Sequence, residues 1–207
     1  MKRIFSLLIT ALAVAPLIAF AQARYQYTEL KPPQPLENGG KKVEVVEFFW
    51  YGCPHCYNLE PVLETWLKKL PPDAQFRRIP AVFNDRWAHD ATIFYTFEAL
   101  GVLERLHRPL FDAIHRDHLR TDSQAAMTEW LAKNDVDPKK FFETMKSFGV
   151  QSKTKRAIQL TTAYKIDGTP AMAVQGRYTV SAEQGGSREG MLDTVSYLVD
   201  LSRKSGK

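Results

Sequence analysis

Cys53 and Cys56 are the residues of this chain whose type and spacing could do chemistry by themselves. They are its only cysteines in 207 residues and lie in the run Cys53-Pro54-His55-Cys56. Two cysteines at this spacing can form a reversible disulfide, and the chemistry of such a pair is thiol-disulfide exchange. We therefore predict a redox-active disulfide between Cys53 and Cys56.

Three other uses of these cysteines compete with redox chemistry. Covalent haem attachment requires a histidine directly after the second cysteine, but Tyr57 stands there. A metal site would need further ligands, of which His115 and His118 could share one helix face. A purely structural disulfide would close so short a loop that it would constrain little of the unfolded chain. Redox function is the preferred interpretation, and we expect neither a metal nor a cofactor.

The elements around the motif should give the two sulfur atoms different environments. The apolar run 43–50 before the motif predicts a buried strand. The segment after it predicts a helix with Cys53 at the N-cap and Pro54 in the first turn. Cys56 should point toward the buried face, whereas Cys53 should point past the helix end and be exposed. The apolar face of this helix carries Leu59, Val62, Leu63, Trp66, Leu67 and Leu70.

An exposed thiol at a helix N-terminus is expected to ionise easily. The helix dipole and the free backbone N–H groups stabilise a thiolate there and lower its pKa. The side chain of His55 can add positive charge or a hydrogen bond to the Cys53 thiolate. Cys53 is therefore the predicted reactive sulfur.

Several charged residues near the motif need separate interpretations. Glu60, Glu64 and Lys68 should line the solvent-facing side of the helix. Glu47, six residues before Cys53, is an acid in an otherwise apolar strand, and such a local conflict often marks a functional site. The alternative for Glu47 is a solvent-facing position like the one expected for Glu44.

The rest of the chain predicts an α/β fold with an inserted helical subdomain. Pro71-Pro72 should stop the first helix, and residues 75–81 read as a second strand. Helices in series follow, then the turn Gly168-Thr169-Pro170, a hairpin of residues 171–174 and 177–180, and a last helix. We divide the chain into a signal peptide (1–23), a first part with the motif (24–86), the helical insertion (87–165) and a final part (166–207).

The first residues have the order of a secretory signal peptide. Lys2-Arg3 precede an uncharged apolar stretch that ends in Ala21-Gln22-Ala23, where cleavage is expected. A membrane anchor is the alternative, because residues 4–23 are long enough to span a bilayer. Export would place the cysteines in an oxidising compartment.

Composition excludes several classes of protein. With 44% hydrophobic and 25% charged residues, the chain is neither wholly disordered nor collagen-like. The net charge of +5 is mild, and Lys153, Lys155 and Arg156 are spread along a helix without stacking aromatics. We interpret them as a solvated face and expect no nucleic-acid partner. The tryptophans Trp50, Trp66, Trp87 and Trp130 are interpreted as packing residues.

The motifs together resemble those of a known family. A strand ending in Trp50-Tyr51-Gly52, the CPHC motif and Gly168-Thr169-Pro170 before a hairpin resemble a thioredoxin fold with its cis-proline loop. With the signal peptide and the inserted helices, the mature chain resembles the DsbA family of periplasmic thiol-disulfide oxidoreductases over essentially its whole length.

The resemblance implies roles for individual residues. Cys53 would be the sulfur that attacks and is attacked, Cys56 the resolving cysteine, and His55 a stabiliser of the Cys53 thiolate. Pro170 would be the cis-proline that faces the pair, although a plain turn at residues 168–170 is the alternative. Pro54, Thr169 and Pro170 would bind substrate. Glu47 resembles in position the buried acid that moves protons to and from the sheltered cysteine.

The resemblance also implies partners and a direction of electron flow. A stabilised Cys53 thiolate favours the reduced form, which makes the disulfide a good oxidant. The expected substrates are reduced secreted polypeptides, and the expected oxidant is a membrane quinone reductase of the DsbB type, with the protein acting as a monomer.

Two other functions remain possible from the sequence. Thr169 stands where the best-known DsbA proteins have valine, which leaves open a periplasmic reductase or isomerase with a reduced pair. A non-catalytic peptide-binding module that uses the groove around Pro170 is the second.

Overall fold

The structure is a computed structural model that describes residues 25–205. The predicted signal peptide, residues 1–23, and the alternative anchor at residues 4–23 lie outside this range. Within residues 25–205, no helix combines the length and the apolar character needed to cross a membrane.

A sheet of five described strands forms the centre of the molecule. Its strands, in chain order, are β1 (Thr28–Glu29), β2 (Val43–Phe49), β3 (Ala74–Pro80), β4 (Ala171–Val174) and β5 (Tyr178–Ser181). Their order across the sheet is β1-β5-β4-β2-β3. Only β2 and β3 are parallel, and the other neighbours are antiparallel.

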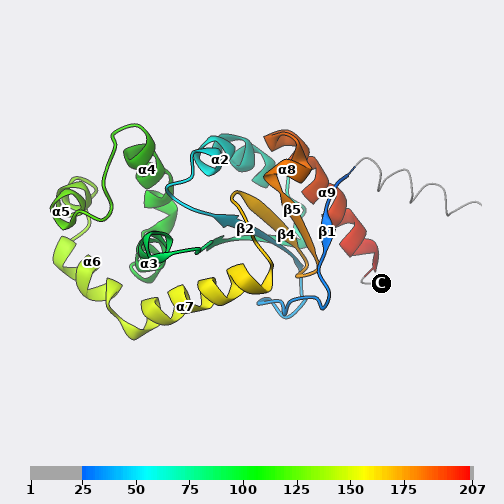
Figure 1. Ribbon diagram of the computed structural model, residues 1–207, viewed down its shortest axis with the longest axis horizontal. Coiled ribbons are helices and arrows are strands. Elements are labelled where there is room, and N and C mark those ends of the chain that lie inside the picture. The colour runs from blue at the N-terminus through cyan, green and yellow to red at the C-terminus, as the bar shows by residue number, and fades with distance from the viewer. Residues whose placement is uncertain (1–24, 206–207) are drawn as a thin grey trace, which may run out of the picture.

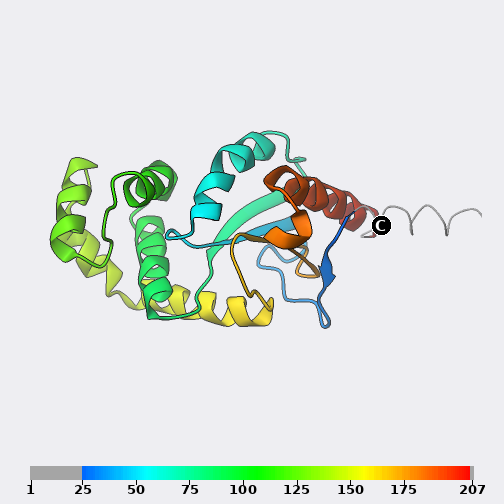
Figure 2. The same ribbon diagram turned by 45° about the horizontal axis from the view of Figure 1, so that its top comes forward.

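Helices cover both faces of this sheet. The described helices are α2 (Pro54–Leu67), α3 (Asp85–Ala99), α4 (Leu103–His115), α5 (Gln124–Lys133), α6 (Pro138–Met145), α7 (Phe148–Ala163), α8 (Ala182–Gly185) and α9 (Arg188–Ser205). Figure 1 shows α2 and α9 on one side of the sheet and α7 on the other. Helices α3–α6 gather beyond one end of the sheet, as the turned view of Figure 2 also shows.

Strand β2 is buried along its whole length because both of its faces are covered. Side chains alternate between the two faces of a strand. Val43 and Val45 pack in one cluster with Leu59 and Leu63 of α2. Glu47 therefore falls on the face of β2 that α2 covers.

The other face of the sheet shares its core with the helical insertion. Val46 and Phe48, which point to this face, belong to one cluster with Leu160 of α7, Phe97 of α3 and Phe111 of α4. The insertion is thus packed onto the sheet through aromatic side chains and is continuous with its core.

The structure confirms the predicted fold and most of its elements. β2 and β3 coincide with the predicted strands to within one residue, and the predicted hairpin is β4 and β5. Cys53 is the N-cap of α2, with Pro54 in its first turn. The helix ends at Leu67, so Leu70 lies beyond it, and the short strand β1 and helix α8 were not predicted.

Candidate redox site

Cys53 and Cys56 are placed by the start of α2. Cys53 caps the helix, and its Sγ accepts the backbone N–H of Cys56 at 3.4 Å. The two cysteines are not joined in this structure. Cys56 has no exposed surface, and Cys53 is only 6% exposed, so the predicted exposure of Cys53 is wrong. The carbonyl oxygen of Thr169, 3.3 Å from Cys53 Sγ, lies over the helix end and shelters this sulfur.

The two thiols have opposite acidities. A hydrogen bond from the Cys56 side chain is the largest of the influences that lower the pKa of Cys53 to about 5, and it acts against burial. Backbone N–H groups of Cys56 and His55 add to this effect. Burial raises the pKa of Cys56 well above its ordinary value, with the hydrogen bond to Cys53 and the charges of Cys53 and Glu47 acting in the same direction. Cys53 is the nucleophile of the pair at neutral pH.

The loop before β4 faces the cysteines. The Thr169-Pro170 peptide bond is cis, as predicted. Pro170 and His55 line a hollow of about 180 Å³ beside α2, together with Leu59 and Met191. The hollow therefore lies next to Cys53, with apolar residues at its base and the exposed His55 at its rim. Among the described residues the His55 side chain makes no hydrogen bond to Cys53, so the predicted influence of that side chain on the Cys53 thiolate stays a prediction.

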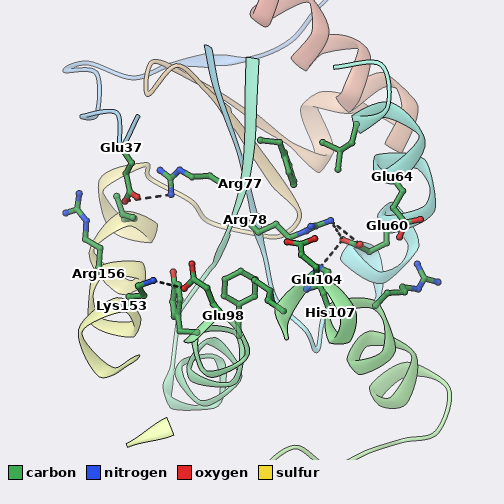
Figure 3. Close-up of a pocket in the computed structure, with 17 residues that line it drawn as sticks. Glu37, Glu60, Glu64, Arg77, Arg78, Glu98, Glu104, His107, Lys153 and Arg156 are labelled. Carbon is green, nitrogen blue, oxygen red and sulfur yellow. Dashed lines mark hydrogen bonds and ion pairs between the residues drawn. The ribbon is translucent and has the colours of Figure 1, made fainter. Parts of the chain in front are cut away.

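A buried cluster of charges lies between the sheet and α2. Arg78 of β3 donates from Nε to Glu47 Oε2 at 3.0 Å and from Nη2 to both carboxylate oxygens of Glu60 at 3.2 Å. Glu47 has no exposed surface and Glu60 is 1% exposed. The second oxygen of Glu47, Oε1, is buried without a hydrogen-bond partner among the described residues. Figure 3 shows Arg78 reaching across to Glu60 from the strand.

Arg78 donates hydrogen bonds to two acids, Glu47 and Glu60, and the pKa values of these acids shift in opposite directions. Burial raises the pKa of Glu47 to about 8, because the attraction of Arg78 is too weak to compensate and Glu60 repels a second negative charge. Burial also disfavours the charge of Glu60, but the interaction with His107, whose Nε2 lies 3.5 Å away, and the charge of Arg78 outweigh it and lower the pKa. Glu47 is therefore the member of this pair that holds a proton near neutral pH.

Two of the predictions for acidic residues are wrong. Glu60 is buried, whereas its neighbours Glu64 and Lys68 are exposed as predicted. The reason is that α4 packs against this side of α2 and places His107 on Glu60. Glu44, the expected solvent-facing comparison for Glu47, is 2% exposed and pairs with Arg77 at 3.1 Å.

Sequence reasoning missed Arg78, Glu60 and His107 as members of the site. A signal was present for the first: two consecutive arginines occupy a strand that borders the buried β2. Cations at such positions need acidic partners. No comparable signal pointed to His107, which is distant in sequence and comes from the helical insertion.

Helix α4 also touches the backbone of the active-site turn. The ring nitrogen Nε2 of His115 lies 2.8 Å from the carbonyl oxygen of Tyr51, and its ring stacks on Tyr57 at a centroid distance of 4.7 Å. Tyr57 in turn donates to Asp112 at 2.8 Å. His115 thus supports the turn before Cys53, and because α4 ends at His115, His118 does not share a helix face with it.

The tryptophans have packing roles, as predicted. Trp50 stacks on Trp87 at 4.2 Å and donates its indole N–H to the buried Asp90 at 2.8 Å. Trp66 donates to Ser196 of α9, and Trp130 packs near Phe97.

Comparisons with known proteins agree with this site. The chain matches the family described as DSBA-like thioredoxin domain over residues 68–193. It is 41% identical over 180 residues to the thiol:disulfide interchange protein DsbA of Azotobacter vinelandii, covering 87% of this chain and 84% of the relative. It is 38% identical over 209 residues to the protein of the same name from Pseudomonas aeruginosa, covering 98% and 99%.

Solved structures give the same result. The crystal structure of Pseudomonas aeruginosa DsbA superposes with a TM-score of 0.82 at 38% identity, covering 88% of this chain and 94% of that one. The oxidoreductase NmDsbA1 from Neisseria meningitidis superposes with a TM-score of 0.75 at 30% identity, covering 88% and 94%.

Proposed function

Because the chain belongs to the DsbA family of thiol:disulfide interchange proteins, we propose that it oxidises its substrates through a mixed disulfide at Cys53. The protein is a thiol-disulfide oxidoreductase whose redox pair is Cys53 and Cys56. The observation that carries the proposed direction is the pKa of Cys53, lowered to about 5 while that of Cys56 is raised. A stabilised thiolate favours the reduced enzyme, and the disulfide form is then a strong oxidant.

The reaction begins with a substrate thiolate that attacks Cys53 Sγ of the oxidised enzyme. The bond between Cys53 and Cys56 breaks, its electron pair goes to Cys56 Sγ, and a disulfide forms between the substrate and Cys53. A second thiolate of the substrate attacks the substrate sulfur of this mixed disulfide and releases Cys53 as a thiolate. The substrate has lost two electrons, and the enzyme has gained them as a dithiol.

Glu47 supplies a proton to Cys56 in this scheme. The Cys56 thiolate that leaves in the first step is buried and strongly disfavours its charge. Glu47 is protonated near neutral pH, and its Oε1 is buried without a hydrogen-bond partner in the described part of the chain. These properties suit a group that gives a proton to Cys56 and takes it back when the enzyme is reoxidised.

Pro54, Thr169 and Pro170 are the proposed substrate-binding residues. Thr169 presents its backbone next to Cys53, and an extended substrate segment can pair there as an added strand. An apolar substrate side chain would enter the hollow formed by His55, Leu59, Pro170 and Met191. His55 would also stabilise the Cys53 thiolate with its side chain.

The proposed setting is the periplasm, reached through the signal peptide at residues 1–23. The substrates are reduced secreted polypeptides, and a membrane quinone reductase of the DsbB type would return Cys53 and Cys56 to the disulfide. The protein is proposed to act as a monomer in both reactions.

The equilibrium reduction potential of the Cys53–Cys56 pair tests the direction of electron flow. We expect a value more positive than about −180 mV in glutathione buffers at pH 7, above the range of the glutathione pool. A value near that of thioredoxin, about −270 mV, would instead establish a reductase.

Trapping tests the route through Cys53. C56S whose Cys53 is first converted to a mixed disulfide with thionitrobenzoate should exchange that leaving group for a thiol of a reduced, unfolded substrate and accumulate the substrate-bound form, because no second enzyme thiol can resolve it. C53S should neither form such a species nor oxidise the substrate. Undiminished folding assistance by C53S would establish a non-catalytic binding module and contradict the proposal.

A further inference from the structure

His107 connects the helical insertion to the charge cluster behind the cysteines. It lies on α4 and is 6% exposed. Its Nε2 is 3.5 Å from Glu60 Oε1, and its Nδ1 is 2.9 Å from the hydroxyl oxygen of Tyr51. Figure 3 shows this contact between His107 and Glu60 at the side of Glu60 that faces α4.

The contacts of the imidazole define its tautomer. Burial raises the pKa of Tyr51 well above its ordinary value, so the phenol keeps its proton and donates it to Nδ1 of His107. The neutral ring then carries its own proton on Nε2 and directs it toward Glu60. This arrangement agrees with a Glu60 that is ionised.

The buried charges can balance in two ways. Glu47, Glu60 and Arg78 would together carry one net negative charge if all three were ionised, and an uncompensated buried charge is costly. The cluster is neutral when Glu47 is protonated and His107 is not. It is also neutral when Glu47 is ionised and His107 is protonated.

We propose that His107 is a positioning residue that compensates the charge of Glu47 during thiol-disulfide exchange. When Glu47 gives its proton to Cys56 Sγ, His107 takes up one proton from water at Nδ1 and becomes a cation. When Glu47 regains a proton, from water or from Cys56 on reoxidation, His107 releases its own. This role of His107 rests on the proposed role of Glu47. The compensating proton enters and leaves on the α4 side of the cluster, whereas Glu47 exchanges its proton with Cys56.

Protonation at Nδ1 requires that the Tyr51 hydroxyl turn from donor to acceptor, which a phenol oxygen can do without moving. The Tyr51 proton then needs a new acceptor or water. The rings of Phe49, Phe94 and Phe111 surround the imidazole with centroids at 5.2, 6.1 and 5.2 Å, so the ring itself stays in place.

A path for water reaches this side of the cluster. Glu60, Arg78, His107 and Glu104 line a cavity of about 610 Å³ between α2, β3 and α4. None of its lining residues belongs to the hollow beside Cys53. Protons can therefore enter at His107 while a substrate covers the cysteines.

The groups that face His107 determine when it is charged. Burial lowers its pKa, and Arg78 of β3 acts in the same direction, whereas Glu60 of α2 and Glu104 of α4 favour the cation. Tyr51 makes the remaining polar contact. The ring is therefore neutral near pH 7 until Glu47 becomes an anion.

The test is the pH dependence of single-turnover oxidation of the reduced protein by glutathione disulfide. In this step Cys56 must lose a proton to resolve the mixed disulfide at Cys53, so the rate should rise with pH as Glu47 ionises. H107Q keeps an N–H donor but removes the titratable ring. We expect its profile to move to higher pH by about one unit, which is an about tenfold loss of rate at a given pH on the rising limb.

Three further variants make the result specific. H89Q makes the same chemical change at a histidine outside the cluster, where Nε2 contacts the Thr121 carbonyl oxygen at 2.8 Å, and should leave the profile unchanged. E47Q should remove the rising limb, and H107Q should have no further effect in the E47Q background. An unchanged profile in E47Q would overturn the role of Glu47, whereas an altered E47Q with an unchanged H107Q would overturn only the role of His107.

A measurement on the unaltered ring covers the case in which H107Q does not fold. The ring nitrogen chemical shifts of His107 in the reduced protein should show the Nε2–H tautomer at pH 7. Its pKa should fall in E47Q, because the acid that favours the cation has been removed. A pKa that does not move, or an Nδ1–H tautomer, would overturn the proposal.

Discussion

The difference between Cys53 and Cys56 comes from where the first turn of α2 places each sulfur. Cys53 lies at the end of the helix, where its Sγ receives hydrogen bonds from the Cys56 thiol and from backbone N–H groups. Cys56 lies three residues later, inside the core and on the side of Glu47. The same short motif thus contains one thiol that ionises easily and one that resists ionisation.

The acidity of Cys53 predicts how the reduction potential depends on pH. A cysteine in an unfolded chain has a pKa of about 8.5. Because the folded value, about 5, is lower, the thiolate stabilises the reduced protein fully above the unfolded value. That stabilisation is lost as the pH falls through about 5.

Reduction therefore takes up one proton above pH 5 and two below it. We expect the potential to fall by about 30 mV per pH unit from about pH 5 to pH 7 and by about 59 mV per unit below that range. Equilibration with glutathione or dithiothreitol at several pH values measures both slopes. A slope of about 59 mV per unit up to pH 7 would show that Cys53 is protonated there.

In H55A the change of slope should move to higher pH if the imidazole stabilises the thiolate, and the absence of a shift would remove that role.

At the scale of residues, the sequence was informative where the chemistry is local. The spacing of Cys53 and Cys56 and the misplaced acid Glu47 could be recognised from neighbouring residues alone. Glu60 could not, because the helical period places it beside Glu64 and only the packing of α4 buries it. The partners of Glu47 are brought together by contacts between distant segments, which no local pattern records.

The turn that joins β2 to α2 depends on a glycine for steric reasons. A Cβ atom on Gly52 would overlap the ring of Trp50. That ring cannot easily move, because it stacks on Trp87 and donates a hydrogen bond to Asp90. The position before Cys53 therefore has no room for a side chain.

G52A should consequently destabilise the protein by about 2 kcal/mol, a typical cost of forcing extra atoms into a packed region. Gly168, at the other loop of the site, is the matched control, because a Cβ atom there would meet nothing within 4 Å. Denaturant unfolding of both variants measures the difference in free energy. Equal stability of G52A and the unaltered protein would show that the Trp50 ring can yield.

At the scale of elements, the strongest patterns predicted the structure well. The apolar run of β2, the Cys53 cap of α2 and the turn between β4 and β5 all depend on short-range preferences. β1 has only two residues, Thr28 and Glu29, and forms because β5 offers an edge to pair with. Such a strand has no periodic pattern of its own to recognise.

The helical insertion and the sheet share one core at the scale of the whole molecule. Phe48 and Phe49 of the sheet pack in the same cluster as Phe97, Phe111 and Phe141 of the insertion. The series of helical patterns at residues 87–165 predicted an insertion, but its mode of docking depends on these long-range aromatic contacts. The division of the chain into separate parts at residues 87 and 165 remains a prediction.

The shared core predicts a single unfolding transition. Trp66 contacts α9 beside the sheet, and Trp130 lies on α5 in the insertion, so the two report on different parts. In protein labelled with fluorotryptophan, their native signals should disappear at the same denaturant concentration. Earlier loss of the Trp130 signal would mean that the insertion unfolds independently.

The shelter of Cys53 has a consequence for the order of events in a substrate. Only 6% of this residue is accessible, and the approach to its sulfur passes between the end of α2 and the Thr169-Pro170 loop. A substrate thiol can reach this sulfur on a flexible, unfolded segment but not on the surface of a folded domain. A substrate cysteine therefore becomes inaccessible to Cys53 once the substrate has folded around it. The folding rate of the substrate then limits the time in which Cys53 can oxidise it.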